Sequence, residues 1–352
     1  MDLATVRGIE HDRRVRLAVD AMGGDHGPDE VVAGALLYAA RHPDDSLILV
    51  GVPERIEAVA PGGLPAGVTV AASSQVIGMD EHPALALRAK KDASILVATD
   101  LVRNGLADAV ITAGHTGAGV AAGILRLGRA PGVDRPALAV QMITATGPLV
   151  LLDIGATPDS TGENLFQYAH MGSLFAERAL GVERPRVALL SIGEETGKGD
   201  ARIRRATELL APSRLNFVGN IEGKDLVRHS ADVVVCDAVL GNVTMKFFEG
   251  LSSFILRDLL LDGELRRLPF GPVAKLLLAP GLRRIKRQFD YEVLGGSPLL
   301  GVRGTVVITH GRAGRRMVMH AIRVGAAAAR ARLPELIGET FRPAAPVAET
   351  RA

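Results

Sequence analysis

Short apolar runs alternate along the chain with longer segments in which apolar residues recur every three to four positions. Strands are expected at the short runs, namely residues 16–19, 46–50, 68–71, 107–112, 137–142, 149–152, 186–191, 215–218, 232–236 and 306–309. Helices are expected at the periodic segments, chiefly residues 31–41, 84–104, 163–179, 200–210, 244–261 and 317–332. Such alternation predicts an α/β fold in three layers, a mostly parallel sheet with helices on both faces.

The two ends of the chain differ from its periodic part. Residues 1–14 are too charged for a secretory signal, and we expect a flexible extension there. Residues 15–332 carry the alternating pattern and are expected to form the folded domain. Residues 333–352 are polar and contain proline, which predicts a disordered tail.

Composition then limits the classes of function. A net charge of +2 and 3% aromatic residues, with no tryptophan, argue against a nucleic-acid-binding protein. The single cysteine, Cys236, excludes an intrachain disulfide and is typical of a reducing cytoplasm. We also find no uncharged apolar run of the roughly 18 residues that a membrane-spanning helix needs. A cytoplasmic, soluble protein is expected.

One glycine-rich stretch, Ala18–Pro28, separates the first expected strand from the first expected helix. Its glycines, Gly23, Gly24 and Gly27, allow a tight backbone whose amides can face an anion. The same residues also fit an ordinary turn between a strand and a helix. Two acids, Asp20 and Asp25, flank the loop, so a bound phosphate would need cations from other segments.

Polar loops follow several other expected strands in the same way. They come after Val19, Thr112, Leu152, Ser191, Val218, Cys236 and Thr309. Ligands of open α/β sheets bind beyond the carboxyl ends of the strands. The pattern therefore predicts that these loops meet at one edge of the sheet and form an active site there.

The segment Leu251–Phe289 departs from the alternating pattern, because it is rich in leucine and carries a run of basic residues around Arg283–Arg287. One apolar face is expected from the spacing of Leu278, Leu282, Ile285 and Phe289. Such a face beside basic residues suits the surface of an anionic bilayer or an acidic partner. It equally suits a dimer interface or a core helix with a solvated basic side.

Several long motifs resemble the phosphate acyltransferase (PlsX) family of bacterial phospholipid synthesis, over about residues 16–330. The motifs are AVDAMGGDHGP at 18–28, HPALALRAKKDAS at 82–94, TAGHTGA at 112–118, LLDIGAT at 151–157, PRVALLSIGEETGKG at 185–199, FVGNIEGKD at 217–225, DVVVCDAVLGNVTMKFFEG at 232–250, GGSPLLGVRG at 295–304 and ITHGRA at 308–313. The resemblance implies a fold similar to phosphotransacetylases and to isocitrate and isopropylmalate dehydrogenases.

The same resemblance implies an activity and a set of partners. The enzyme would move a long-chain acyl group from acyl carrier protein to inorganic phosphate, forming acyl phosphate. It would act as a homodimer, associated peripherally with the inner face of the cell membrane. Its product would pass to a membrane glycerol-3-phosphate acyltransferase.

This chemistry needs placement of phosphate and stabilisation of an oxyanion more than it needs a general base, because phosphate is already an anionic nucleophile. Residues that would act on the reacting groups are Lys90, Lys91, Asn220, Asn242, Lys246 and His310. Residues that would bind phosphate or orient the groups that do are Asp20, Gly23, Gly24, Asp25, Gly27, Gly114, His115, Thr116, Asp153, Glu194, Lys198, Glu222 and Asp237.

Each of these residue types also has a structural interpretation. Adjacent lysines fit a solvated helix face, asparagines after glycine fit turns, and acids fit helix caps. No metal or cofactor is expected, because the histidines are scattered and no dinucleotide fingerprint occurs. Three other hypotheses stay open: an acyl-CoA:phosphate transferase, a metal-dependent hydroxyacid dehydrogenase and a non-catalytic membrane scaffold.

Overall fold

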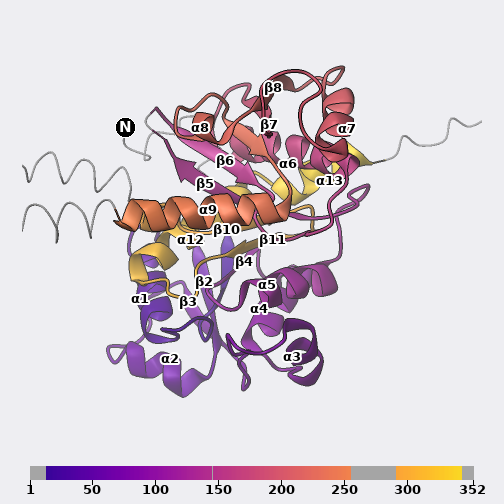
Figure 1. Cartoon of the computed structure of the whole chain (residues 1–352). Coiled ribbons are helices and arrows are strands. Elements are labelled where there is room, and N and C mark those ends of the chain that lie inside the picture. The colour runs from indigo at the N-terminus through magenta and orange to yellow at the C-terminus, as the bar shows by residue number, and fades with distance from the viewer. Residues whose placement is uncertain (1–12, 145, 255–290, 343–352) are drawn as a thin grey trace, which may run out of the picture.

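The computed structural model describes residues 13–144, 146–254 and 291–342 (Figure 1). Its strands are β1 (Arg16–Asp20), β2 (Ser46–Gly51), β3 (Val68–Ala72), β4 (Ala109–Thr112), β5 (Ala137–Ile143), β6 (Pro148–Leu152), β7 (Arg186–Leu190), β8 (Asn216–Ile221), β9 (Val233–Val235), β10 (Ser297–Leu300) and β11 (Thr305–Ile308). Its α-helices are α1 (Asp29–Ala39), α2 (Pro53–Val59), α3 (Pro83–Ala89), α4 (Ser94–Arg103), α5 (Thr116–Ala122), α6 (Gly162–Leu180), α7 (Ala201–Leu210), α8 (Gly223–Leu226), α9 (Ala238–Ser253), α12 (Arg315–Arg330) and α13 (Leu333–Phe341).

The described strands form one sheet in the order β3-β2-β1-β4-β11-β10-β5-β6-β9-β7-β8. Strands β1 to β4 and β11 are parallel to one another, and so are β6 to β9. Antiparallel pairings of β11 with β10, β10 with β5 and β5 with β6 separate the two groups. Three reversals in succession leave the two parallel groups running in opposite directions.

Because of this reversal, the prediction that the polar loops all meet at one edge of the sheet is wrong. The loops after β1, β4 and β11 lie together at one edge, whereas those after β6, β7 and β9 belong to the oppositely directed group. The short connections between β5 and β6 and between β10 and β11 supply two of the three antiparallel pairings, because a hairpin can join only antiparallel strands.

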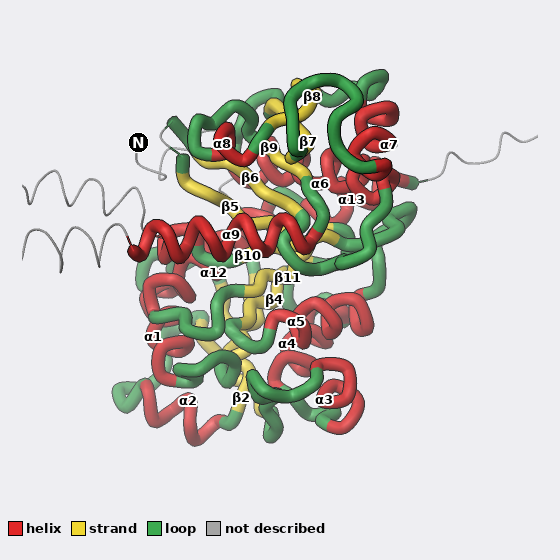
Figure 2. The backbone as a smooth tube through the Cα atoms, viewed as in Figure 1, coloured by secondary structure: helices red, strands yellow, loops and turns green. Residues whose placement is uncertain are grey.

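The helices cover both faces of the sheet, as the alternating pattern predicts. Alternate strand residues point to opposite faces, so Leu17 and Val19 belong to one apolar core and Ala18 to the other. Helices α1, α2, α6, α7, α12 and α13 pack on the first core, and α3, α4, α5 and α8 on the second. Met245 and Phe248 place α9 on the second face as well. Figure 2 shows α9 as a straight helix crossing in front of the sheet.

Local signals explain where several helices begin and end. Asp29 and Glu30 occupy the first turn of α1, where acids offset the partial positive charge of the helix. A capping box between Thr161 and Asn164 starts α6, and Gly181 ends it in the left-handed conformation at φ 70°. The expected helix 84–104 is instead two helices, α3 and α4, with residues 90–93 between them.

The chain end differs from the expected tail. Leu333–Phe341 is helix α13, so the expectation of disorder from residue 333 is wrong over this range. Leu333 and Ile337, one turn apart, are buried in the first core and supply the packing that fixes the helix. Residues 1–12 of the expected extension and residues 343–352 lie outside the described part of the chain.

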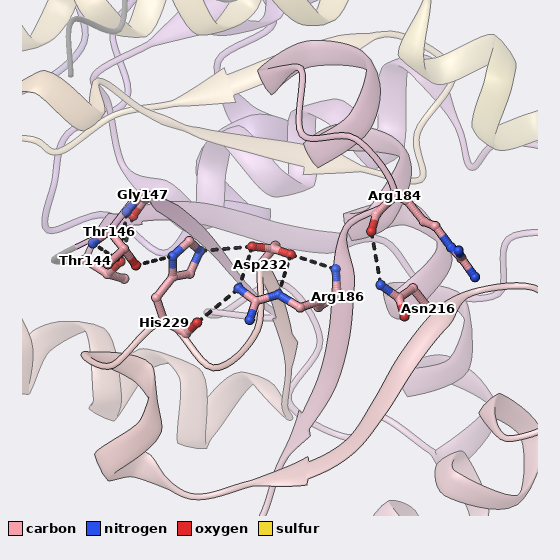
Figure 3. Close-up of polar contacts among 8 residues, drawn as sticks. All are labelled: Thr144, Thr146, Gly147, Arg184, Arg186, Asn216, His229 and Asp232. Carbon is pink, nitrogen blue, oxygen red and sulfur yellow. Dashed lines mark hydrogen bonds and ion pairs between the residues drawn. The ribbon is translucent and has the colours of Figure 1, made fainter.

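A polar network ties the amino ends of β6, β7 and β9 (Figure 3). Arg186 makes a bidentate contact with Asp232, with both N–O distances at 3.0 Å. His229 Nε2 lies 3.0 Å from Asp232 Oδ1, and His229 Nδ1 lies 2.7 Å from the Thr146 hydroxyl. The network lies at the opposite strand ends from the polar loops, which gives it a structural role.

None of the described helices combines the length and the apolar character that a bilayer crossing requires.

Candidate active site

The centre of the candidate site is the side-by-side placement of Asp20 and Thr112. Asp20 ends β1 and Thr112 ends β4, and the parallel register pairs the two residues. The Thr112 hydroxyl donates to Asp20 Oδ2 at 2.7 Å and accepts from the Gly114 amide at 3.0 Å. Strand pairing therefore fixes the carboxyl group and the start of the next loop relative to each other.

Two glycines allow the first loop to press against the second. A Cβ atom on Gly23 would lie 2.7 Å from the Gly114 nitrogen and 2.8 Å from Asp20 Oδ2. Gly24 has φ +85°, and a Cβ there would lie 2.8 Å from the Gly311 carbonyl oxygen. The Asp25 amide donates to that same carbonyl at 2.8 Å. The loops after β1, β4 and β11 therefore form one contiguous surface.

A pocket opens between these loops and α4. About 240 Å³ of space here is not filled by protein atoms, and part of that space is open solvent. Its lining residues are Asp20, Gly23, Val76, Ile77, Ser94, Ile95, Thr112, Gly114, His115, Ala118 and Gly119. Four of the predicted binding residues, Asp20, Gly23, Gly114 and His115, are thus brought together.

Asp20 contributes a carboxyl group to the lining of this pocket. It is 2% exposed, and burial raises the pKa of its carboxyl above the ordinary value of 3.8. The hydroxyls of Ser94 and Thr112 partly offset this rise in pKa. Oδ1 nevertheless accepts no hydrogen bond of ordinary geometry from the described residues.

The two predicted lysines are placed differently from each other. Lys90 Nζ donates to the Val76 carbonyl at 2.6 Å and pairs with Glu81 at 2.5 Å. Because Val76 lines the pocket, Lys90 braces the pocket wall. Lys91 is exposed and makes no ion pair with any described residue.

Of the other predicted residues of these loops, His115 lines the pocket, whereas Thr116, Gly27 and His310 lie around it. His115 caps α5 and accepts from the Gly117 amide through Nδ1, while Thr116 is exposed. The Gly27 carbonyl accepts from Arg55 at 3.4 Å, which brings a cation from α2 to the first loop. His310 is exposed and accepts from the Arg312 amide.

Among the loops that follow β6, β7, β8 and β9, the carboxyl group of Asp153 binds backbone amides. Its two carboxyl oxygens accept from the amides of Leu138, Gly155, Ala156 and Thr157 at 2.7–3.0 Å. The side chain is fully buried, which raises its pKa, while the four amides favour the ionised form. With its acceptors occupied, Asp153 holds the loop after β6.

Cys236 lies directly behind this loop. Its sulfur is 3.7 Å from the Asp153 carbonyl oxygen. The thiol is fully buried, and burial raises its pKa well above the ordinary value. Cys236 is therefore unsuited to act as a nucleophile.

Charged residues after β7 and β8 neutralise one another. Lys224 contacts Glu222 at 2.9 Å and Glu194 at 3.4 Å. Asn220 lies inside β8 rather than in the loop after it, and its side-chain nitrogen is 3.5 Å from the carbonyl oxygen of Lys198. The Lys198 ammonium group itself is exposed.

Helix α9 carries the last group of predicted residues. Asp237 caps it, accepting from the amides of Val239 and Leu240. Asn242 and Lys246 follow one turn apart, with Asn242 half-buried and Lys246 exposed. Both lie on the sheet face that also carries α4 and α5, but neither lines the pocket.

Two further points complete the account of the predicted residues. Leu278, Leu282, Ile285 and Phe289 lie outside the described part of the chain. Among the described residues, no group of three or more histidine, cysteine or acidic side chains could hold a metal ion.

Sequence reasoning missed Thr112 and Ser94 as pocket residues. Thr112 was expected only as the end of a strand, although it opens the TAGHTGA motif opposite Asp20. Ser94 closes the HPALALRAKKDAS motif at the point where the expected helix breaks. In both cases the signal was a polar residue at an element boundary inside a motif.

Solved structures of the same fold include a phosphotransacetylase and a branched-chain phosphotransacylase. A phosphotransacetylase from Streptococcus pyogenes matches with a TM-score of 0.57 at 15% identity, over 89% of this chain and 94% of its own. A branched-chain phosphotransacylase from Enterococcus faecalis V583 matches with a TM-score of 0.56 at 15% identity, over 90% and 99%. The expected likeness to phosphotransacetylases is confirmed at the level of fold.

Sequence comparison identifies the family of the chain. A family model described as fatty acid synthesis protein matches residues 15–336. A phosphate acyltransferase of Heliobacterium modesticaldum is 47% identical over 313 residues, 88% of this chain and 92% of its own length. One from Desulfitobacterium hafniense is 46% identical over 312 residues, with the same coverage. The chain therefore belongs to the fatty acid synthesis protein family, together with relatives named phosphate acyltransferase.

Proposed function

We propose that this enzyme transfers a long-chain acyl group from a thioester donor to inorganic phosphate, releasing acyl phosphate and a thiol. The observation that carries the proposal is the pocket in which the glycine loops after β1 and β4 meet the start of α4 around Asp20. Membership in a family with named phosphate acyltransferases supports the reaction type.

The reaction is a substitution at the thioester carbonyl. An anionic phosphate oxygen attacks the carbonyl carbon, a C–O bond forms, and the C–S bond breaks. The thiolate leaves with the electron pair and takes a proton from solvent. Phosphate needs no activation by a strong base, so the protein contributes placement and donors for the oxyanion. The amides and hydroxyls around Gly23, Ser94 and Gly114 suit that task.

The proposed donor is acylated acyl carrier protein, an acidic partner. On α7, Arg204 is exposed and its side chain donates only to the Gly199 carbonyl, with no ion pair to any described residue. Its neighbours Arg202 and Arg205 are paired with Asp200 and Glu163. Arg204 is therefore the α7 residue whose charge is free to attract the donor, and Arg204→Glu should raise the KM for acyl carrier protein.

Assembly and location are proposed as well. We infer a homodimer, supported by an exposed apolar stripe on α9 formed by Val239, Val243, Phe247 and Leu251, which a second copy would cover. We infer a cytoplasmic enzyme held peripherally at the membrane through segment 251–289, delivering acyl phosphate to a membrane glycerol-3-phosphate acyltransferase. Sedimentation and flotation with anionic vesicles test the two inferences.

The decisive experiment incubates the purified protein with phosphate and either palmitoyl-acyl carrier protein or palmitoyl-CoA. Formation of a hydroxylamine-trappable product together with free carrier thiol is expected with the first donor. A faster reaction with the CoA thioester would favour a phosphotransacetylase-like enzyme. Absence of product with both donors would leave a non-catalytic scaffold as the better interpretation.

A further inference from the structure

The pocket contains a carboxyl group where an anion is expected to bind. Asp20 lines the pocket; its Oδ2 accepts from the Thr112 hydroxyl, but its Oδ1 is buried and accepts no hydrogen bond of ordinary geometry from the described residues. A buried acceptor left without a donor is costly, and a native protein usually provides a partner for it. The missing donor is therefore expected to come with the ligand.

The rest of the pocket presents donors. Ser94 and Ile95 begin α4, a helix of 10 residues whose N-terminus favours negative charge. Gly114 and His115 add the start of the loop after β4. Besides Asp20, His115 is the titratable side chain among the lining residues.

We propose that Asp20 makes this pocket selective for a tetrahedral oxyanion that carries a hydrogen atom, such as hydrogen phosphate, and rejects sulfate. The inference rests on the proposed function and identifies how its phosphate site chooses the ion. Hydrogen phosphate can donate its O–H to Asp20 Oδ1 while its other oxygens accept from the helix start and the hydroxyls. Sulfate has no hydrogen to donate near neutral pH, so it would meet the carboxylate as an unpaired negative charge.

The expected selectivity is large. A site built to bond a ligand hydroxyl rejects an analogue without it by as much as about 10⁴-fold, because buried polar groups are then left unpaired. Here part of the pocket is open, so we expect phosphate to bind at least roughly 100-fold more tightly than sulfate. Asp20→Asn keeps the shape, removes the charge and adds an amide donor, and should bring the two affinities to within about tenfold.

The test is calorimetric titration of the full chain with inorganic phosphate and with inorganic sulfate, at about pH 8, where phosphate keeps one hydrogen. The same titrations are run on Asp20→Asn and on Asp44→Asn, a matched change at a side chain that is 80% exposed. Strong preference for phosphate in the wild type and in Asp44→Asn, with the preference lost in Asp20→Asn, supports the proposal.

Equal affinities of the wild type for the two ions would overturn the inference. This comparison uses the wild-type protein alone and does not depend on whether a variant folds. If Asp20→Asn kept the preference for phosphate over sulfate, the inference would be overturned as well, because another group would then be recognising the O–H of phosphate. Binding of neither ion would remove the pocket as the site. The acyl phosphate assay separates these results from failure of the proposed function, since product formation would continue if only the ion selectivity were wrong.

Discussion

Arg330 Nη2 lies 2.6 Å from both carboxyl oxygens of Asp45, an ion pair that joins the end of α12 to the loop before β2. The Asp45 side chain is 1% exposed and also accepts from the Tyr38 hydroxyl at 2.6 Å. Because Tyr38 lies on α1, the contact ties three segments together beneath the strand that carries Asp20.

This ion pair makes a prediction about stability. Asp45→Asn should lower the free energy of unfolding by about 3–5 kcal/mol, because it leaves the Arg330 charge without a partner in a largely buried position. Urea unfolding of the two proteins measures the change. Asp44→Asn, next in sequence and solvated, is the control and should stay within about 0.5 kcal/mol of the wild type. Equal losses in both variants would mean that the ion pair contributes no more than surface charge.

A second prediction concerns the Thr112 hydroxyl. Thr112→Val should raise the KM for phosphate about tenfold and cost about 1–3 kcal/mol of stability, because Asp20 Oδ2 and the Gly114 amide lose their shared partner. Thr112→Ser retains the hydroxyl and should behave like the wild type. Steady-state kinetics with varied phosphate gives the answer. An unchanged KM in the valine variant, with reduced stability, would limit Thr112 to a structural role.

The raised pKa of Asp20 makes a prediction about pH. A carboxyl with a higher pKa in the folded chain than in the unfolded chain binds protons more tightly when folded. Its contribution to stability is therefore complete below the ordinary value of 3.8 and is lost as the pH rises through the folded pKa. The wild type should lose stability relative to Asp20→Asn as the pH rises from about 4 through the raised pKa of the folded Asp20. Denaturant unfolding across this range tests it, and a constant difference would contradict it.

A fourth prediction separates the adjacent lysines. Lys90→Ala should lower kcat/KM for phosphate about tenfold, because the Val76 carbonyl on the pocket wall and Glu81 lose their donor. Lys91→Ala should have a smaller effect, since its side chain is exposed. Arg88→Ala, on the same surface, controls for the loss of one positive charge. A larger loss in Lys91→Ala would place phosphate at the exposed lysine, and unchanged rates in both would exclude the pair from phosphate binding.

Much of the fold could be predicted from the sequence because its signals are local. The alternation of buried runs and helical segments identified the three-layer α/β fold, and the glycines around Gly23 marked the loop that forms the pocket. Acids before helices marked caps, as Asp237 of α9 shows. Such features follow from φ/ψ preferences and side-chain period, which neighbouring residues fix on their own.

The direction of the strands, and which strands and side chains lie next to each other, were decided only by the tertiary structure. The three antiparallel pairings among β11, β10, β5 and β6 reversed half of the sheet and divided the polar loops into two groups. The packing of Ile337 made part of the expected tail into α13. The roles of Thr112 and Ser94 likewise depend on which strand lies beside β1 and where α4 begins. The physical reason is that hydrogen-bond pairing and burial join residues far apart in the chain, so a residue's type determines what it can bond and the fold alone determines what it meets.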